Sequence, residues 1–430
     1  MSKLIVEVSK IISVEKHPNA DLLDICKVRG WSVIVQKNSF KVGDLCIYFP
    51  PDSLIPSSIY NGRLNVSKYL HDISKDLNLI DYKRVVATRL RGIPSFGLIM
   101  PLDFSKGDDP NWVEGTDVLD YFEVKKYDPP VKIAEGEVEI QSSKFFDYTS
   151  IENIKNYPNA IKDGTDVVIT EKIHGSNSRI GLVLESDENG NPIWTKMGGS
   201  HSLRRREWVD IETRFRISAL NNLGINLPLN LNDVILVNNK YWRIKSIVEP
   251  TKPEDELKFQ CLQVDENNNL VKARSQYWTG LTSEVDALLS YLRDAPYSEE
   301  KYSIIIYGEI YGLVQDMKYG LNSIKFRAFD IAINNKYLSF DEQQNLFSRF
   351  NVDMVPILYR GPFTMSKVEE LTSGDTTLCP KNLAGNFSGR EGIVIKPTTE
   401  IDYSPIINGR CILKSISADY LARKGGTEYH

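Results

Sequence analysis

The sequence is poor in cysteine and histidine, the residues that build disulfide frameworks and many metal sites. Its five cysteines are scattered along the chain without a Cys-x-x-Cys pair, at Cys26, Cys46, Cys261, Cys379 and Cys411. An odd, scattered set excludes a zinc ribbon and a disulfide scaffold, and it predicts a reducing intracellular compartment such as the cytoplasm. The lack of clustered histidines and aspartates also argues against a nuclease or phosphatase that relies on several such metal ligands.

Long apolar stretches and a large net charge are missing as well. No run reaches the ~18 apolar residues that a membrane-spanning helix needs, and the start, MSKLIVEVSKIISVEKH, alternates apolar and charged residues instead of presenting a signal peptide. With 52 basic and 57 acidic residues, the net charge is −5. We therefore expect no membrane partner and no general affinity for polyanions, while local basic groups such as Arg89–Arg91 are compatible with a modest footprint on nucleic acid.

The chain of 430 residues is too long for one ordinary domain, and residues 1–124 predict a small closed β-barrel. Short apolar runs alternate there with turn residues, for example HPNAD at 17–21. These runs lie at 4–14, 25–28, 31–35, 45–49, 84–91 and 95–100. Several short strands in so little sequence favour a barrel over an open sheet.

Residues 125–146 are polar, contain a proline pair and predict a linker. Residues 147–430 then combine strand and helix patterns, so this second domain is expected to be α+β. The strand patterns lie at 167–170, 179–184, 303–310, 326–332, 392–396 and 411–415, and the helical ones at 207–223 and 340–350. A β-rich segment with asparagine-rich turns, at about 229–275, is expected to be an insertion in this domain.

Three lysines precede a glycine by three positions: Lys27, Lys172 and Lys196. The spacing alone has no meaning, and a solvated strand edge explains Lys27 and Lys196. Lys172 differs because it follows the apolar strand at 167–170 and precedes a turn at 174–178. Desolvation lowers the pKa of an amine, and a nucleophilic lysine needs such a site because free lysine, with a pKa near ~10.4, is protonated at neutral pH.

Charged residues interrupt several apolar strands further along the chain. Glu309 lies within IIIYGEIYG at 304–312, where a carboxylate is costly unless it is paired or binds something. KFRAFDI at 325–331 places an aromatic residue beside an aspartate, and REGIVIKP at 390–397 brackets a strand with Glu391 and Lys396. RCILKS at 410–415 carries Lys414. Taken singly, each is compatible with an ordinary strand end.

Taken in order, these motifs resemble those of the covalent nucleotidyltransferases, which are the polynucleotide ligases and mRNA-capping enzymes. EKIHGSN, YGEIYG, KFRAFDI, EGIVIKP and NGRCILKS resemble the nick-sealing RNA ligases of the T-even phage type. The front part, from VEKHPNADLLDICKVRGWSVIV to TRLRGIPSFGLIMPL, is similar to the N-terminal OB module of the Deinococcus and Naegleria RNA ligases. The resemblance implies an α+β protein in which an OB-fold-like, RNA-binding barrel precedes a nucleotidyltransferase domain.

The resemblance also implies a reaction and its residues. Lys172 would attack the α-phosphate of ATP, the AMP would pass to an RNA 5′-phosphate, and an RNA 3′-OH would then seal the strand, in the simplest case at a nick in a duplex. The implied nucleotide-binding residues are Glu171, Lys172, Ile173, His174, Asn177, Glu309 at the ribose, Phe329 on the adenine, and Lys396 and Lys414 at phosphates. Glu391 and Glu309 are the implied ligands of Mg²⁺ or Mn²⁺. The protein is expected to act as a monomer on RNA ends.

Three features depart from the family pattern. The phage-type ligases have a second lysine two positions after the one that matches Lys414, where this sequence has Ile416. The arginine expected after the Lys172 motif has no unique match, and the candidates for a phosphate or RNA contact are Arg204, Arg205 and Arg206. A solvated basic stretch is the alternative explanation for them. The insertion either extends the RNA footprint through the interleaved KYWRIK at 240–245, or is a structural addition.

Two other functions compete with an ATP-dependent RNA ligase. DNA ligases and capping enzymes carry an OB domain after the last motif, whereas 16 residues follow Lys414 here, which favours the RNA ligases. The second alternative is a non-catalytic RNA- or tRNA-binding protein, because HPNAD and GW also resemble tRNA-binding modules. Such a protein would not need Lys172 together with its partner motifs. The physiological RNA and the tolerance for DNA have no sequence signature.

Overall fold

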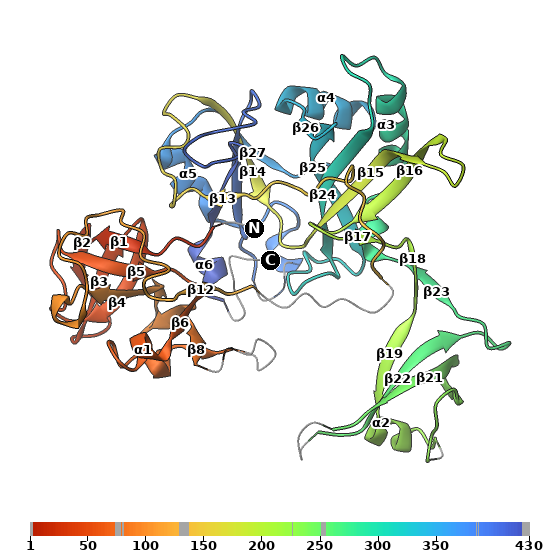
Figure 1. Ribbon diagram of the computed structural model, residues 1–430, viewed down its shortest axis with the longest axis horizontal. Coiled ribbons are helices and arrows are strands. Elements are labelled where there is room, and N and C mark those ends of the chain that lie inside the picture. The colour runs from red at the N-terminus through yellow and green to blue at the C-terminus, as the bar shows by residue number, and fades with distance from the viewer. Residues whose placement is uncertain are drawn as a thin grey trace.

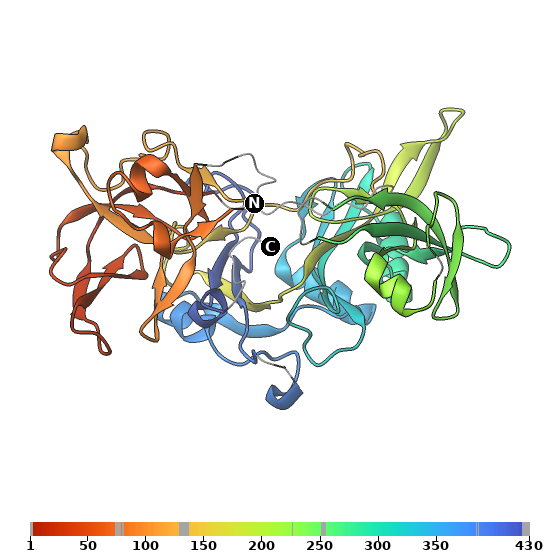
Figure 2. The ribbon, with the colours of Figure 1, turned by 90° about the horizontal axis from the view of Figure 1, so that it is seen from below.

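The structure is a computed structural model that describes residues 3–73, 79, 81–128, 137–225, 227–250, 255–383, 385 and 387–423. Part of the predicted linker, residues 129–136, lies outside the described residues. Figure 1 shows three bodies: an N-terminal barrel, a central pair of sheets, and a smaller sheet that projects from the far end. Figure 2, from below, shows that the barrel and the projecting sheet lie at opposite ends of the molecule.

The N-terminal body consists of short strands around the central strand β5 (Leu45–Phe49), as the alternating pattern predicts. The strands join into sheets ordered β1-β5-β11, β2-β3-β4, β10-β9 and β12-β6-β8-β7. Their bounds are β1 Glu7–Lys10, β2 Ser13–Lys16, β3 Leu23–Val28, β4 Trp31–Gln36, β6 Ser53–Pro56, β7 His71–Asp72, β8 Tyr82–Arg84, β9 Ala87–Leu90, β10 Ile93–Phe96, β11 Leu98–Pro101 and β12 Lys125–Lys126, with α1 at Ser57–Tyr60. Register aligns Val8 and Met100 with Ile47 of β5, and all three side chains are buried in one core.

The central body is built from two facing sheets. One is ordered β13-β29-β28-β14-β27 and the other β17-β16-β15-β24-β25-β26. The first contains β13 Glu152–Asn153, β14 Asp166–Lys172, β27 Ile357–Pro362, β28 Gly392–Pro397 and β29 Leu413–Ile416. The second contains β15 Ser176–Ser186, β16 Pro192–Gly199, β17 Arg204–Arg205, β24 Ser303–Gly312, β25 Ile324–Ile333 and β26 Lys336–Tyr337.

Helices cover these sheets on their outer faces. α3 (Ser283–Asp294) and α4 (Phe340–Arg349) pack on the second sheet, and α5 (Met365–Thr372) packs on the first, while α6 (Ala418–Leu421) follows β29. A capping box at Ser339 starts α4, because the Ser339 side chain accepts from the Glu342 amide and Glu342 accepts from the Ser339 amide. The helix predicted at 340–350 is therefore confirmed.

The helix predicted at 207–223 is wrong over most of its length. The structure has strands β18 (Trp208–Asp210) and β19 (Glu212–Arg216) there, followed by the short helix α2 (Ile217–Asn222). The β19 segment pairs with β22 (Lys258–Val264) in the projecting sheet, whose order is β19-β22-β21-β20, with β20 at Val234–Val237 and β21 at Lys240–Val248. This long-range pairing overrides the local helical pattern. A ribbon of β18 and β23 (Lys272–Arg274) leads to this sheet.

The barrel packs against the central body through apolar and charged contacts. Trp31 lies in a cluster that also holds Tyr311 and Tyr420, and the Lys155 ammonium lies 3.5 Å from the centre of a Trp31 ring. Arg89 pairs with Asp419 at 3.2 Å. The barrel is thus held close to the C-terminal end of the central body. Among the described residues, no helix is long and apolar enough to cross a membrane.

Candidate active site

A cavity of about 150 Å³ lies between the two sheets of the central body. It brings together residues from strands that are far apart in the sequence. Most of the predicted site residues line it: Glu171, Lys172, Ile173, Asn177, Glu309, Phe329, Glu391, Lys396 and Lys414. His174 does not line the cavity, but its imidazole lies beside Glu391. The sequence motifs therefore converge on one pocket.

Lys172 is the last residue of β14, and its amine donates to the Glu391 carboxylate. Glu391 precedes β28, which pairs with β14, so the Lys172–Gly392 register carries the two charges to the same end of the sheet. Burial alone would raise the pKa of Glu391, but Lys172 and His174 outweigh burial and lower that pKa to about 2. Glu391 is thus a buried carboxylate that stays ionised at neutral pH.

His174 occupies the turn after β14 and is almost fully buried. Its Nε2 lies 2.7 Å from Asp316 Oδ1, its Nδ1 lies 2.9 Å from the Tyr420 hydroxyl, and Glu391 Oε2 is 3.6 Å from Nδ1. Its backbone N–H donates to the Tyr319 hydroxyl at 2.7 Å. The imidazole is therefore fixed from several sides, next to the carboxylate that holds Lys172.

Asn177 and Glu309 are neighbours on the opposite wall. They are register partners on β15 and β24. Burial raises the pKa of Glu309 to about 8; the charge of Lys172 opposes this shift and that of Glu391 adds to it. The buried Asn177 Oδ1 has no hydrogen-bond partner among the described residues. An uncompensated buried oxygen and a carboxyl group with a raised pKa, both lining one cavity, fit a polar ligand such as a sugar.

Lys396 is engaged differently from the phosphate role that the resemblance implies. Its ammonium donates to Asp330 Oδ1 at 2.7 Å and to the Phe329 carbonyl at 3.0 Å, and burial lowers the pKa of this lysine. Lys396 would have to leave a buried ion pair to reach a phosphate. In this arrangement it fixes the backbone at Phe329, whose ring packs 4.9 Å from that of Tyr148, centre to centre.

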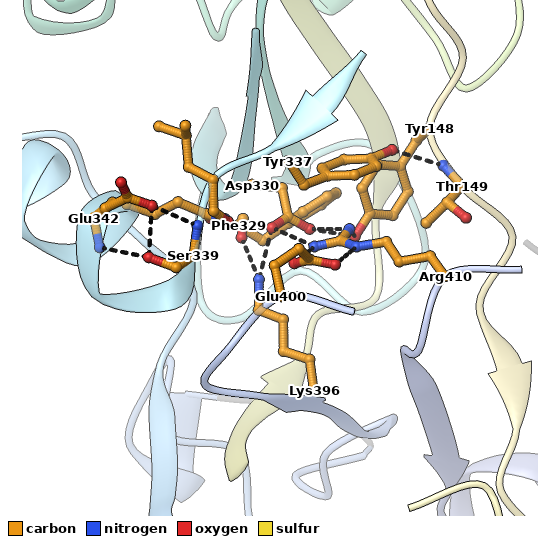
Figure 3. A network of polar contacts seen from close by, with 12 residues as sticks. Tyr148, Thr149, Phe329, Asp330, Tyr337, Ser339, Glu342, Lys396, Glu400 and Arg410 are labelled. Atoms are coloured by element: carbon orange, nitrogen blue, oxygen red, sulfur yellow. Dashed lines mark hydrogen bonds and ion pairs between the residues drawn. The ribbon is translucent and has the colours of Figure 1, made fainter. Parts of the chain in front are cut away.

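Asp330 is the centre of a buried ion network (Figure 3). Arg410 donates to Asp330 Oδ2 at 2.9 Å and Oδ1 at 3.1 Å, and also to Glu400 at 2.7 Å. Tyr148 donates to Asp330 Oδ2 at 2.5 Å. Burial would raise the pKa of Asp330, but Arg410 and Lys396 overcome it and hold that pKa far below its usual range. Two cations and a hydroxyl thus satisfy one fully buried carboxylate.

Lys414 lies on β29 opposite Val394 of β28, and its side chain lines the cavity. This position agrees with a phosphate-facing lysine. Ile416, two residues later on the same strand, is buried in the apolar cluster with Tyr420. Ile416 therefore offers no cation at the position where the phage-type ligases have a second lysine.

Glu171 and Ile173 line the cavity, but their side chains are engaged in contacts elsewhere. The Glu171 carboxylate accepts from the Thr376 hydroxyl at 2.5 Å and from the Thr377 amide at 2.8 Å. Ile173 belongs to the apolar cluster between barrel and central body. The side chain of Glu171 therefore ties β14 to the loop at Thr376 and Thr377.

Arg204, Arg205 and Arg206 are not among the residues that line the cavity. Arg204 pairs with Glu139 at 2.9 Å, and the buried Arg205 pairs with Glu137 at 3.3 Å. Both ion pairs tie β17 to Glu137 and Glu139, which lie within the predicted linker. His201, from the same stretch, does line the cavity, and burial lowers its pKa.

Sequence reasoning missed several residues that hold the site together. Tyr148, Thr149, Ser150 and Ile151 line the cavity from the chain before β14, and Arg410, Tyr420 and Arg423 brace its charged groups. Arg179, fully buried, binds the Phe145 carbonyl at 2.6 Å and Asp147 at 2.8 Å, which anchors that chain to β15. The one available signal was the aspartate after Phe329, since a charge inside an apolar strand needs a partner.

The resemblance implies a metal ion at Glu309 and Glu391, which both line the cavity. Within the described ranges, no group of three or more His, Cys, Asp or Glu side chains is arranged to hold an ion by itself. Glu391 nevertheless lies close enough to Glu309 for its charge to raise the pKa of Glu309. Mg²⁺ commonly binds one or two carboxylates together with substrate phosphates. These residues thus fit a metal that arrives with a nucleotide, and do not form a closed protein cage.

Comparisons with known proteins agree with this architecture. The family model described as RNA ligase matches residues 165–416, and an OB-fold domain model matches residues 5–102. A mutant of the Naegleria gruberi RNA ligase with ATP and Mn is similar at 20% identity and a TM-score of 0.62, over 97% of this chain and 98% of that chain.

Two further structures of that ligase cover the same shares of both chains, 97% and 98%. One contains PPi (21% identity, TM-score 0.61), and the other is a mutant with AMP and Mn (20% identity, TM-score 0.61). The search of curated proteins found no match. The predicted fold, an OB-fold barrel before an α+β nucleotidyltransferase domain, is confirmed.

Proposed function

The chain belongs to the RNA ligase family, and from that premise we propose that it uses ATP to join an RNA 3′-OH end to an RNA 5′-phosphate end, at nicks in duplexes. The observation that carries the proposal is the position of Lys172. This lysine ends a buried strand inside a cavity, beside a carboxylate, with polar and aromatic groups around it. The Naegleria ligase structures with ATP, AMP and PPi support a nucleotide as the ligand of this cavity.

The first step would make a covalent lysine adduct. Lys172 Nζ, after losing a proton, attacks the α-phosphorus of ATP, the N–P bond forms, and the bond from that phosphorus to the bridging oxygen breaks. Pyrophosphate leaves with the electron pair. In the ligand-free arrangement the amine is an ammonium paired with Glu391, so the nucleotide must arrive together with a change in this ion pair.

The next steps would transfer AMP and seal the RNA. An oxygen of the RNA 5′-phosphate attacks the α-phosphorus and the Lys172 nitrogen leaves; the RNA 3′-OH then attacks the 5′-phosphorus and AMP leaves. Every step moves phosphoryl charge, so cations must stabilise it. Lys414 is the cavity lysine best placed for that role. Phe329 would stack on the adenine, and Glu309 and Asn177 would bind the ribose hydroxyls.

The carboxylates Glu391 and Glu309 are the residues that would hold Mg²⁺ or Mn²⁺. When bound there with the phosphates, the ion would offset phosphoryl charge. The protein groups act around it: Lys396 and Asp330 fix Phe329, His174 and its partners fix Glu391, and Tyr148 closes the aromatic side of the cavity. These contacts exist before the nucleotide binds, which lowers the cost of ordering the site.

The test is covalent labelling. Incubated with Mg²⁺ and ATP labelled at the α-phosphate, the wild type should become labelled, and Lys172→Ala should not. Lys196→Ala is the matched control, because Lys196 has the same spacing to a glycine but pairs with Asp286 outside the cavity; it should label like the wild type. An unlabelled wild type would refute the ligase proposal and favour a non-catalytic RNA-binding protein.

Sealing assays define the substrate. Glu309→Ala should keep its fold but lose sealing of a nick that ends in a ribose 3′-OH, because the ribose loses its carboxylate partner. Sealing of all-RNA, all-DNA and hybrid nicks should be compared under the same conditions. Equal sealing of DNA and RNA nicks would contradict the RNA preference and favour a DNA ligase.

A further inference from the structure

The projecting sheet and the ribbon that leads to it form a small module with its own core, described at residues 208–225, 227–250 and 255–275. Its buried residues include Ile235, Trp242, Ile244 and Phe259, and they form a cluster separate from those of the two larger bodies. Trp242 lies inside this core, so the KYWRIK segment does not present all its aromatic residues to RNA. Figure 1 shows the module projecting from the end of the second sheet, connected by β18 and β23.

Strand register segregates the module's charges onto one side. Arg216 is the register partner of Lys258, Arg214 that of Gln260, and Arg243 lies across Leu262 from Glu212. Cross-strand partners share a face, and residues two apart on a strand share it too. The alternate residues point into the module core. The side opposite that core, here called the open face, therefore collects basic residues.

The open face is positive although the module's sequence is not. Among the module's described residues, five cations gather there against two carboxylates: Arg214, Arg216, Arg243, Lys245 and Lys258, against Glu212 and Glu256. Lys245 is placed there by its 2.8 Å bond to Glu212. Other acidic residues are used in turns, since Asp233 accepts from the Asn230 amide and Asp265 from the Asn267 and Asn269 amides.

Exposed apolar and aromatic surface borders these cations. Tyr241 is 39% exposed and Leu236 52% exposed, and the two are register partners on the same face. A cationic surface with an accessible aromatic ring suits the backbone and bases of a nucleic acid. It does not suit an apolar peptide, because the exposed Arg214 and Arg216 lie on its first strand, β19.

We propose that the open face binds the phosphodiester backbone of the RNA that flanks the joined ends. This inference rests on the proposed function, since the occupant is the RNA substrate itself. The cavity would hold the nucleotide and the ends, while the module adds phosphate contacts further along the strand. The insertion therefore extends the footprint by means of its strand register, and Arg214 and Arg216 are the principal contacts.

The test compares two variants of equal charge change in the same module. Arg214→Gln/Arg216→Gln alters the open face. Lys240→Gln/Lys272→Gln is the control: Lys240 lies on the other side of the sheet, one position before Tyr241, and Lys272 lies on the ribbon. Binding of a fluorescent nicked RNA duplex is measured over a range of salt concentrations, with long flanks and with flanks trimmed to a few base pairs.

Two phosphate contacts contribute roughly 1.4–1.8 to the slope of log K against log salt. On the long duplex, the slope for the open-face variant should be smaller than the wild-type slope by about that amount, and on the short duplex it should be unchanged. The control should keep the wild-type slope on both. An unchanged slope, or equal losses in both variants, overturns the proposal; with an unchanged slope, the face would be assigned to a protein partner instead.

Two readouts separate this proposal from the ligase proposal. Labelling with ATP needs no RNA, so the open-face variant should label as the wild type does, whereas failure of the wild type to label concerns Lys172 alone. As a second measurement, RNA that carries a photoreactive base in its flank should crosslink to the peptide containing Tyr241. Crosslinks confined to the other two bodies would refute the open-face assignment even if the variants folded poorly.

Discussion

Replacing Asp330 by asparagine removes one negative charge from the network of Figure 3 and keeps nearly the same side-chain volume. The wild-type carboxylate is fully buried and binds Lys396 at 2.7 Å and Arg410 at 2.9 Å. After the substitution, both cations remain buried, and only Arg410 keeps a carboxylate, Glu400. The variant tests whether this ion network supports both the fold and the position of Phe329.

The expected loss of stability is large. Breaking a buried ion pair by removing one partner costs roughly 3–5 kcal/mol, because a desolvated charge is left behind. In Asp330→Asn, the buried Lys396 ammonium is the charge left without its carboxylate partner. For a domain of this size, 1 kcal/mol shifts the midpoint of thermal unfolding by about 2–4 °C, so a decrease of roughly 6–20 °C is expected.

Thermal and urea unfolding of the two proteins should be compared with a matched control, Asp341→Asn. Asp341 also pairs with an arginine, Arg360, at 2.7 Å, but both side chains are largely exposed. Exposed pairs contribute about 0–1 kcal/mol, so the control should unfold close to the wild type. The Asp330 variant should also label slowly with ATP, because Lys396 no longer fixes the backbone at Phe329.

The pH dependence gives an independent readout. The folded-state pKa of Asp330 lies well below its ordinary value of 3.8, so its contribution to stability is complete above that value and is lost as the pH falls further. Asp330→Asn should lack this component of acid sensitivity. The reasoning is refuted if, at pH 7, the free energy of unfolding of Asp330→Asn lies within 1 kcal/mol of the values for the wild type and for the control.

Two further substitutions test the cavity. Burial raises the pKa of Glu309 from 4.5 to about 8. The folded state therefore binds this proton more tightly than the unfolded state, and the ligand-free protein should lose stability as the pH rises from 4.5 to 8. Glu309→Gln should flatten this decline, measured by urea unfolding with a chelator present. Tyr420→Phe removes the hydroxyl 2.9 Å from His174 Nδ1 and should cost about 1–2 kcal/mol and shift the pH profile of ATP labelling. The control is Tyr403→Phe, because the Tyr403 hydroxyl donates to the exposed Asn408. It should change neither the stability nor the pH profile of labelling. An equal effect of both phenylalanine variants would contradict the role given to Tyr420.

Much of the site was predictable because its motifs are local. A lysine at the end of an apolar strand, a carboxylate within a later strand and an aromatic residue before an aspartate can each be recognised within a few residues. The roles of individual charges were less predictable. Lys396 was expected at a phosphate, but it faces Asp330, and Glu171 faces Thr376 and Thr377.

The projecting module shows the same limit at the level of secondary structure. Its first strand reads as part of a helix from sequence, because the local pattern of 207–223 is compatible with one. Pairing of β19 with β22, which lies more than forty residues later, decides for a strand. The same pairing puts Trp242 in the core and Arg214 on the surface, which composition and periodicity of the segment alone do not specify.

The sequence by itself determined the order of the chemical groups, the strands that carry them and the family to which they point, since these depend on neighbours along the chain. The tertiary structure decided the partners. Lys172 and Glu391 are 219 positions apart, and the network around Asp330 joins four separate segments. Whether a charge meets a phosphate, a carboxylate or water depends on long-range packing and burial, because these set the cost of leaving it unpaired.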